Sequence, residues 1–243
     1  MDTRILAHRG ASFYAPENTM PSFELALEQG ADGLELDVHL SKDGELVVMH
    51  DERVDRTTNA KGFIKDYTLE ELKSFDASYG KSGYENARIP TLREVYSMLS
   101  RSDKIVNVEI KTDIMDYPGI VDKLLAMEDE MGMNGKIIYS SFNHYTVYEL
   151  LMKRPEARIG LLYLSIFANP WTYAKSMGAC ALHPHFITIS KTPDMARECA
   201  ALGIETNIWT VDEPEWMERL QKMGVTSIIT DKPDLACTVL LGK

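Results

Sequence analysis

The stretch RILAHRGASFYAPENTMPSFELALEQG, residues 4–30, sets the pattern for the fold. Its first five residues, 4–8, are typical of a short buried strand, and this strand ends in a histidine. A loop rich in turn-forming residues follows. We then predict an amphipathic helix over 19–29, capped by Asn18 and ended by Gly30. The unit is therefore one strand followed by one helix.

The same unit recurs along the rest of the chain. We predict seven more strands, at 33–40, 105–110, 137–140, 158–162, 181–183, 205–209 and 227–230. The helices that follow them are predicted at 95–100, 120–131, 146–154, 170–177, 194–202, 214–223 and 235–241. Eight such units in 243 residues are typical of a closed (β/α)8 TIM barrel; an open doubly wound sheet is the alternative. We expect one domain over 1–243.

One segment interrupts the alternation of strands and helices. Residues 51–89 are polar and rich in Gly, Asn, Ser and Tyr. A short helix is predicted within them at 69–74, capped by Thr68. Loops of this length in compact domains are usually functional. We therefore predict an insertion at the barrel mouth, after the second strand.

Composition excludes some classes of partner. The chain has 37 acidic and 26 basic residues, a formal net charge of −11, which is unsuited to nucleic acid. Its N-terminus lacks the pattern of a signal peptide, and no apolar run is long enough to span a membrane. The three cysteines show no paired spacing. We expect a cytoplasmic protein without stable membrane insertion; the oligomeric state is left open.

The second predicted strand, GLELDVHL, carries two carboxylates. Glu35 and Asp37 are two residues apart, so they share one face of the strand and are expected to point into the barrel. Burying two like charges is costly unless something compensates them. A divalent cation is the simplest compensation, and a salt bridge with arginine or lysine is the alternative.

The next strand, in KIVNVEIKT, adds a third carboxylate, Glu109, with Lys111 on the same face. Ligands that are all oxygen favour Mg²⁺, Ca²⁺ or Mn²⁺ over Zn²⁺. Lys111 is expected to bind an anionic substrate, to pair with Glu109, or to do both. These residues predict a metal site next to an anion site.

Two histidines follow apolar runs at the same predicted end of the barrel. His8 ends the first strand, and a hairpin turn at Asp43-Gly44 returns the chain to His50. Imidazole groups exchange protons near neutral pH, so the pair is suited to acid–base catalysis.

At this point the sequence resembles the glycerophosphodiester phosphodiesterase family. The resemblance lies in AHRGASFYAPENT, ELDVHLSKDGELVVMHD, RTT, IPTLREV, NVEIK, SSFN, LHPH, WTVD and GVTSIITDKPD, in the family's order over almost the whole chain. It implies a TIM barrel with a small insertion after strand two. It also implies metal-dependent hydrolysis of glycerophosphodiesters to sn-glycerol 3-phosphate and an alcohol.

The resemblance also implies a role for each matching residue. His8 and His50 would be the acid–base pair, Glu35, Asp37 and Glu109 would hold one divalent cation (Mg²⁺ or Ca²⁺, or else Mn²⁺), and Arg9, Glu17, Lys111 and Trp209 would bind the substrate. For Trp209, the alternative of a core aromatic residue is nearly as well supported. His183 is expected to line the mouth. His39 shares the face of Glu35 and Asp37, but the resemblance does not imply a ligand role for it. Asp212 stands where the family usually has Asn, which leaves its role open.

Two other functions remain open at this stage. A phospholipase-type barrel that cleaves lipid headgroups would need an apolar docking surface, and the aromatic residues of the insertion are scattered among charges. A non-catalytic phosphate-binding barrel is expected to lack a histidine or a carboxylate of the set, and all of them are present.

Overall fold

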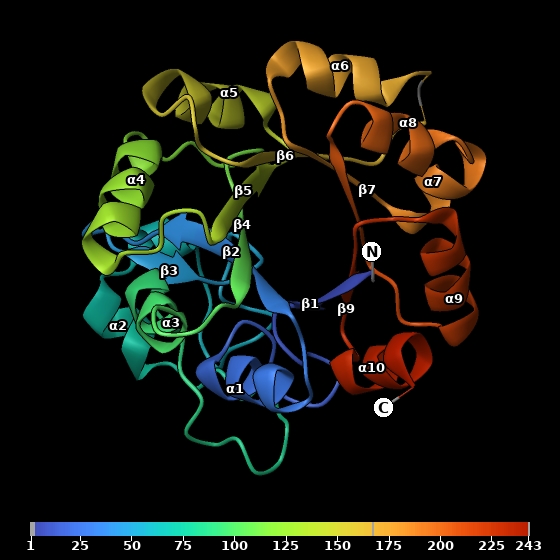
Figure 1. Ribbon diagram of the computed structural model, residues 1–243. Helices are drawn as coiled ribbons and strands as arrows, with labels where there is room; N and C mark the ends of the chain where they lie inside the picture. The colour runs from blue at the N-terminus through green and yellow to red at the C-terminus, as the bar shows by residue number, and fades with distance from the viewer. Residues whose placement is uncertain (1–2, 167, 243) are drawn as a thin grey trace.

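The computed structural model describes residues 3–166 and 168–242, and within them eight parallel strands form a ring. These strands are β1 (Arg4–His8), β2 (Gly33–Leu40), β4 (Ile105–Ile110), β5 (Ile137–Ser141), β6 (Ile159–Tyr163), β7 (Ala181–Pro184), β8 (Glu205–Ile208) and β9 (Ser227–Thr230). Each pairs with its neighbour around the ring, and the direct pairing of β1 with β2 closes it (Figure 1). The predicted TIM barrel is confirmed.

Helices surround this ring on the outside (Figure 1). They are α1 (Met20–Glu28), α3 (Leu92–Leu99), α4 (Ile120–Met131), α5 (His144–Lys153), α6 (Pro170–Met177), α7 (Phe186–Lys191), α8 (Met195–Ala201), α9 (Pro214–Met223) and α10 (Pro233–Leu241). Leu34, Leu36 and Val38 of β2 are fully buried in the main hydrophobic core. Since side chains alternate along a strand, the residues between them, Glu35 and Asp37, face the barrel interior. Among the described helices, none has both the length and the apolar character of a membrane-spanning segment.

Some local features differ from the predictions. The helix α1 begins after Thr19, whose backbone N–H donates to Ser22 Oγ, so Asn18 is not its cap. The helix α3 begins earlier than predicted because Thr91 and Glu94 form a capping box. The short α7 was not predicted; it follows β7 almost directly and is too brief to show a helical period.

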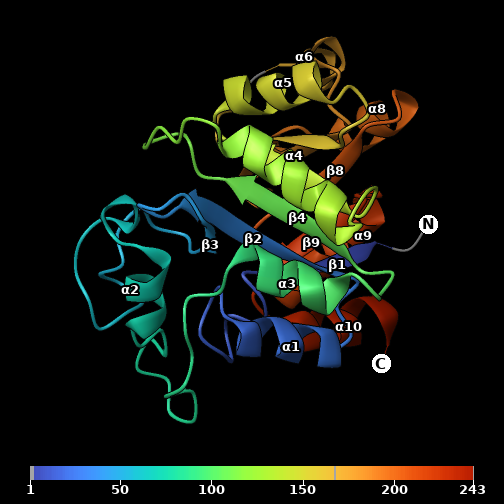
Figure 2. The ribbon, with the colours of Figure 1, turned by 90° about the vertical axis from the view of Figure 1, so that its left-hand side faces the viewer.

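The segment after β2 forms a small unit of its own at one end of the barrel. β3 (Leu46–Val48) pairs antiparallel with β2, as the Asp43-Gly44 turn predicts. Next come the short 3-10 helix η1 (Ile64–Asp66) and α2 (Leu69–Ser74), whose Thr68 cap is confirmed. The unit has a separate core, which includes Val54, Ile64 and Leu72. Figure 2 shows it on the left, at the end toward which the arrowhead of β4 points.

Candidate active site

The candidate site lies where β1, β2 and β4 end. In the parallel register His8 is opposite Glu35, and Asp37 is opposite Glu109. One oxygen atom from each of Glu35, Asp37 and Glu109 lies within 4.8 Å of the other two. The structure therefore brings together the three carboxylates that the sequence predicts as a cluster.

This carboxylate cluster fits a divalent cation. All three side chains are buried, and Asp37 Oδ1 has no hydrogen-bond partner among the described residues. Burial, together with the neighbouring Asp37 and Glu109, raises the pKa of Glu35 well above its usual value. Although burial opposes it, Arg9, His50 and Lys111 lower the pKa of Asp37 to about 2. A bound cation would relieve the repulsion, and oxygen ligands suit Mg²⁺, Ca²⁺ or Mn²⁺.

Two cationic side chains border the cluster. Arg9 Nε lies 3.4 Å from Asp37 Oδ2, and its Nη1 donates to Glu17 Oε1 at 3.0 Å. Its backbone N–H donates to Glu35 Oε2 at 3.0 Å. Lys111 Nζ donates to Glu109 Oε1 at 2.7 Å and lies 3.8 Å from Asp37 Oδ1. The predicted pairing of Lys111 with Glu109 is present, and both cations stand next to the metal-type cluster.

His8 is held by residues from the opposite end of the chain. Its Nδ1 lies 2.6 Å from Asp231 Oδ1, which also accepts a hydrogen bond from Ser12 Oγ. The N–H of Asp231 donates to Asp212 Oδ1 at 2.8 Å. Because the carboxylate accepts the Nδ1 proton, Nε2 is the free ring nitrogen; it lies 4.0 Å from Glu35 Oε2. The sequence did not predict these roles of Ser12, Asp212 and Asp231.

His50 has a matching arrangement. Its Nδ1 lies 2.6 Å from Asp51 Oδ1, and Arg56 Nε donates to Asp51 Oδ2 at 2.7 Å. Burial and the neighbouring Asp37 raise the pKa of Glu109, while Lys111 and His50 lower it. Each of the two predicted histidines therefore has an aspartate on its Nδ1.

Four other residues that the sequence analysis names have contacts of a different kind. Trp209, half-buried just after β8, donates from Nε1 to the carbonyl of His183 and makes an edge contact with Phe142. His183 is fully buried in the barrel beside Asn207, so the expectation that it lines the mouth is wrong. His39 contacts the Tyr117 hydroxyl through Nδ1. Asn18 Nδ2 donates to Asp37 Oδ2 at 2.8 Å, so it supports the cluster rather than a helix.

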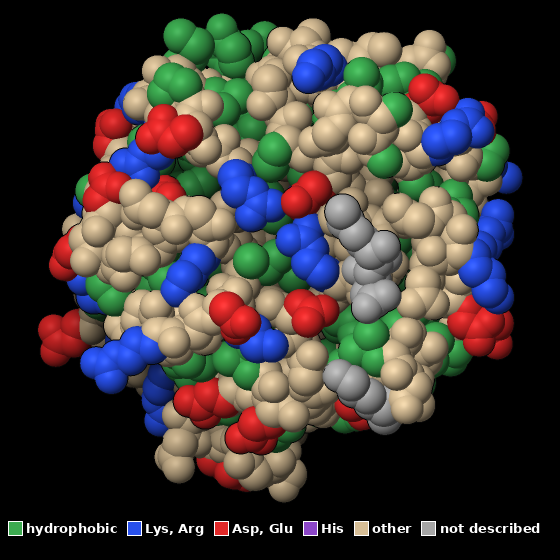
Figure 3. Space-filling view, viewed as in Figure 1, with side chains coloured by type: hydrophobic (Ala, Val, Ile, Leu, Met, Phe, Trp, Pro, Cys, Tyr) green, Lys and Arg blue, Asp and Glu red, His purple; other side chains and the backbone are tan. Residues whose placement is uncertain are grey.

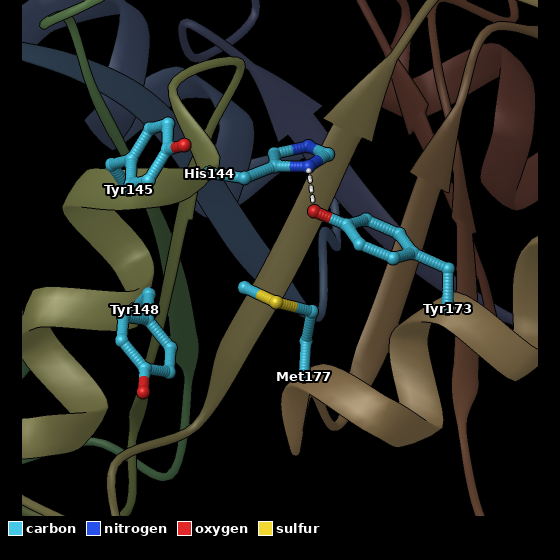
Figure 4. A pocket seen from close by; sticks show the side chains of 5 residues that line it. All are labelled: His144, Tyr145, Tyr148, Tyr173 and Met177. Carbon is cyan, nitrogen blue, oxygen red and sulfur yellow. Dashed lines mark hydrogen bonds between the residues drawn. The ribbon is translucent and has the colours of Figure 1, made fainter.

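A separate pocket lies outside the barrel, between α5 and α6, and has a volume of about 320 Å³ (Figure 4). Its lining residues are His144, Tyr145, Tyr148, Tyr173 and Met177. His144 Nε2 donates to the carbonyl of Leu162, so its Nδ1 accepts from the Tyr173 hydroxyl. None of these lining residues is acidic or permanently charged, so this pocket does not offer the charged groups that would bind a metal ion and a phosphate.

Known proteins support the same assignment. The model of the "Glycerophosphoryl diester phosphodiesterase family" matches residues 8–235. A glycerophosphodiester phosphodiesterase of Caldanaerobacter subterraneus is 48% identical over 236 residues, covering 96% of each chain. One from Bacillus altitudinis is 38% identical, covering 98% of each.

Solved structures of glycerophosphodiester phosphodiesterases also match this chain. A glycerophosphodiester phosphodiesterase from Agrobacterium tumefaciens matches with a TM-score of 0.85 at 29% identity, covering 97% of this chain and 99% of that one. A phosphodiesterase from Oleispira antarctica, solved with the product sn-glycerol-3-phosphate, matches with a TM-score of 0.84 at 28% identity, covering 98% and 96%. With a family model that spans nearly the whole barrel and close relatives of equal length, the chain belongs to the glycerophosphoryl diester phosphodiesterase family.

Proposed function

We propose that the chain hydrolyses glycerophosphodiesters to sn-glycerol 3-phosphate and an alcohol, with one divalent cation held by Glu35, Asp37 and Glu109. The observation that carries this proposal is the buried carboxylate cluster, with His8 Nε2 at 4.0 Å from Glu35 Oε2 and with His50 lowering the pKa of Asp37 and Glu109. The sn-glycerol-3-phosphate bound to the Oleispira antarctica phosphodiesterase supports this choice of product. When bound, such a cation supplies positive charge for the phosphoryl oxygens.

Arg9 and Lys111 are the proposed phosphate contacts. The guanidinium group of Arg9 presents a planar fork that matches two phosphate oxygens, and Glu17 fixes its orientation. Lys111 supplies a second positive charge beside Glu109. We also propose that Trp209 forms one side of the substrate site at the barrel mouth. Its position just after β8 supports this role.

The two histidines are the proposed proton-transfer groups. Each has Nδ1 bound to an aspartate, which keeps its Nε2 available for the substrate. One takes a proton from the nucleophile, either water or the glycerol 2-hydroxyl, the latter giving a cyclic phosphate first. The other gives a proton to the leaving alkoxide. The assignment of His8 and His50 to the two roles is left open.

A panel of substrates tests this function. Glycerophosphocholine, glycerophosphoethanolamine and glycerophosphoglycerol are each incubated with the protein, and sn-glycerol 3-phosphate is quantified. We expect comparable turnover of all three, since the proposed contacts converge on the phosphate. A chelator should abolish turnover, and Mg²⁺, Mn²⁺ or Ca²⁺ should restore it. Full turnover by verified metal-free protein would contradict metal dependence, and a thousandfold preference for one headgroup would contradict the proposed specificity.

A second candidate substrate is an intact lipid. Exposed apolar side chains stand on several connections at the mouth end, including Phe13, Tyr79, Ile114 and Leu164, whose exposed fractions range from 48% to 70%. Such side chains favour contact with a lipid surface. Sedimentation with phosphatidylcholine vesicles, and assay of headgroup release from them, distinguishes this candidate from the first.

We also propose a cytoplasmic location. Cys180 and Cys199 form no disulfide, which is typical of a reducing compartment. The net charge of −11 supports a small-molecule substrate rather than nucleic acid as the partner.

A further inference from the structure

The proposed chemistry leaves one charged residue of the insertion unexplained. Arg56 opens the RTT motif, and its guanidinium group contacts two carboxylates from different segments. It donates to Glu17 at 2.6 and 2.8 Å, in the connection between β1 and α1. It donates to Asp51 at 2.7 and 3.0 Å. Four of the five N–H donors of this guanidinium group are thus used within the protein, which makes it a poor substrate contact.

Each of these carboxylates contacts one residue of the proposed machinery. Glu17 accepts a hydrogen bond from Arg9, the proposed phosphate ligand. Asp51 holds the Nδ1 of His50. Arg56 therefore connects the phosphate-binding arginine with a proton-transfer histidine through one guanidinium plane.

We propose that Arg56 is a positioning residue, which fixes His50 and Arg9 relative to each other through Asp51 and Glu17. The proposal rests on the proposed function for its effect on turnover. Only a planar fork holds two carboxylates in two-point contact at fixed angles; an ammonium group is a point charge. Small displacements of catalytic groups lower the rate strongly, because the reacting atoms must be held close and aligned.

A second residue of the insertion, Lys81, contacts the backbone of the connection between β1 and α1. Lys81 Nζ donates to the carbonyl oxygens of Ser12, Phe13 and Ala15, at 2.6, 3.1 and 2.9 Å. The connection between β1 and α1 is therefore fixed by cations of the insertion at its backbone and at Glu17. The role that we assign to residues 51–89 is to position this connection.

The chain offers a matched control in Arg53. It lies three residues before Arg56 in the same insertion and pairs with Asp55 at 2.9 Å, with its guanidinium over the Phe63 ring. Among its recorded contacts with described residues, none reaches Glu17, Asp51 or the carboxylate cluster. Substitution of Arg53 by alanine removes the same charge as substitution of Arg56 but leaves the contacts to the connection between β1 and α1 in place.

The test compares Arg56→Ala, Arg56→Lys and Arg53→Ala in the metal-loaded protein, with glycerophosphocholine as substrate. We expect kcat of Arg56→Ala to fall on the order of 100-fold. Arg56→Lys should recover only part of it, and Arg53→Ala should stay near the wild type. Added methylguanidinium should restore part of the turnover of Arg56→Ala and leave the other variants unchanged. Unchanged kcat and KM in Arg56→Ala would overturn the proposal, as would equal losses in Arg56→Ala and Arg53→Ala.

A spectroscopic measurement separates this proposal from the proposed function. The Nδ1 proton of His50, shared with Asp51, is expected as a downfield proton resonance that disappears in His50→Gln. It should shift or broaden in Arg56→Ala and stay unchanged in Arg53→Ala, whichever substrate the enzyme uses. If the wild type hydrolyses no glycerophosphodiester, the proposed function fails while this resonance still decides the positioning role. An unchanged resonance in Arg56→Ala overturns that role.

Discussion

The two ends of the barrel both gather arginine and glutamate side chains, but they balance charge differently. At the N-terminal end, Glu205 accepts hydrogen bonds from Arg4 at 2.7 Å and from Arg158 at 2.9 Å, and all three side chains are partly exposed. Figure 3 looks onto this end, where acidic and basic side chains are intermixed over the centre. At the mouth, in contrast, three carboxylates are buried together.

The ion pairs of Glu205 and the buried carboxylate cluster therefore differ in their energetic cost. An exposed ion pair contributes little to stability, because water already solvates both partners. A buried excess of negative charge is costly, and it raises the pKa of Glu35. This costly burial supports the mouth, rather than the other end, as the proposed reactive region.

The largest expected effect comes from a matched pair of substitutions. Glu109→Gln removes one proposed ligand of the cation and should lower kcat/KM by about 1000-fold or more, since a metal contributes several kcal/mol to the transition state. Glu205→Gln, the same chemical change at the other end, should leave kcat/KM near the wild type. Metal binding by calorimetry accompanies the assay. An equal loss of kcat/KM in the two variants would contradict the proposed functional difference between the two ends of the barrel.

The histidines provide the next effect. His8→Ala and His50→Ala should each lower turnover by about 10²–10⁴-fold while the protein stays folded and binds metal. The two losses should be strongly non-additive, because both residues serve one step. A substrate with a very acidic leaving group should rescue the variant that lacks the acid and not the one that lacks the base. Rescue of neither variant would show that the assignment is wrong.

Stability should respond in the opposite sense at the two ends. In the presence of a chelator, Glu35→Gln should raise the free energy of unfolding by on the order of 1 kcal/mol, because it removes a buried charge. Glu205→Gln should lower it by up to about 1 kcal/mol. Urea denaturation measures both changes.

The Glu35 effect should also depend on pH. A carboxyl group whose pKa is raised by folding stabilises the protein fully below the pKa of the unfolded chain, and this contribution is lost as pH rises through the folded pKa. The advantage of Glu35→Gln over the wild type should therefore grow from pH 4 to pH 8. An advantage that shrinks over this range would contradict the raised pKa of Glu35.

The smallest expected effect concerns the protonation of two histidines buried inside the barrel. Burial lowers the pKa of His39 to about 4 and that of His183 to about 3. Imidazole NMR signals of both should therefore show no protonation between pH 8 and pH 5. Because the unfolded chain protonates near pH 6.5, both residues should oppose folding increasingly as pH falls below that value. A midpoint near 6.5 for either ring would show that water reaches it.

The parts of the site that the sequence predicts are those with a local signal. Glu35, Asp37 and Glu109 lie on strands with period-two alternation, so their shared face follows from spacing alone. Asn18 was assigned to the wrong role because a cap and a buried donor to Asp37 have the same local pattern. The fold was predicted because eight repeated units leave few ways to close a sheet.

The parts that the sequence does not predict depend on closure of the barrel. Asp231 meets His8 across 223 positions of chain, and nothing in its local sequence indicates the contact. Arg56 meets Glu17 across 39 positions, after the insertion has folded back onto the mouth. Asp231 contacts His8 and Arg56 contacts Glu17, two residues that the sequence did predict for the site. Supporting contacts of this kind become visible only in three dimensions.

The contact between His8 and Asp231 has a consequence for how the protein is made. The first strand, β1, lies between β2 and the last strand, β9, so the ring closes only when the final strand is present. During synthesis at about 5–20 residues per second, roughly 10–45 s separate His8 from its partner. A nascent chain that has not yet reached Asp231 therefore lacks the carboxylate that contacts His8. Synthesis of β9 and the residue that follows it therefore closes the ring and also supplies the aspartate that contacts a proposed proton-transfer group.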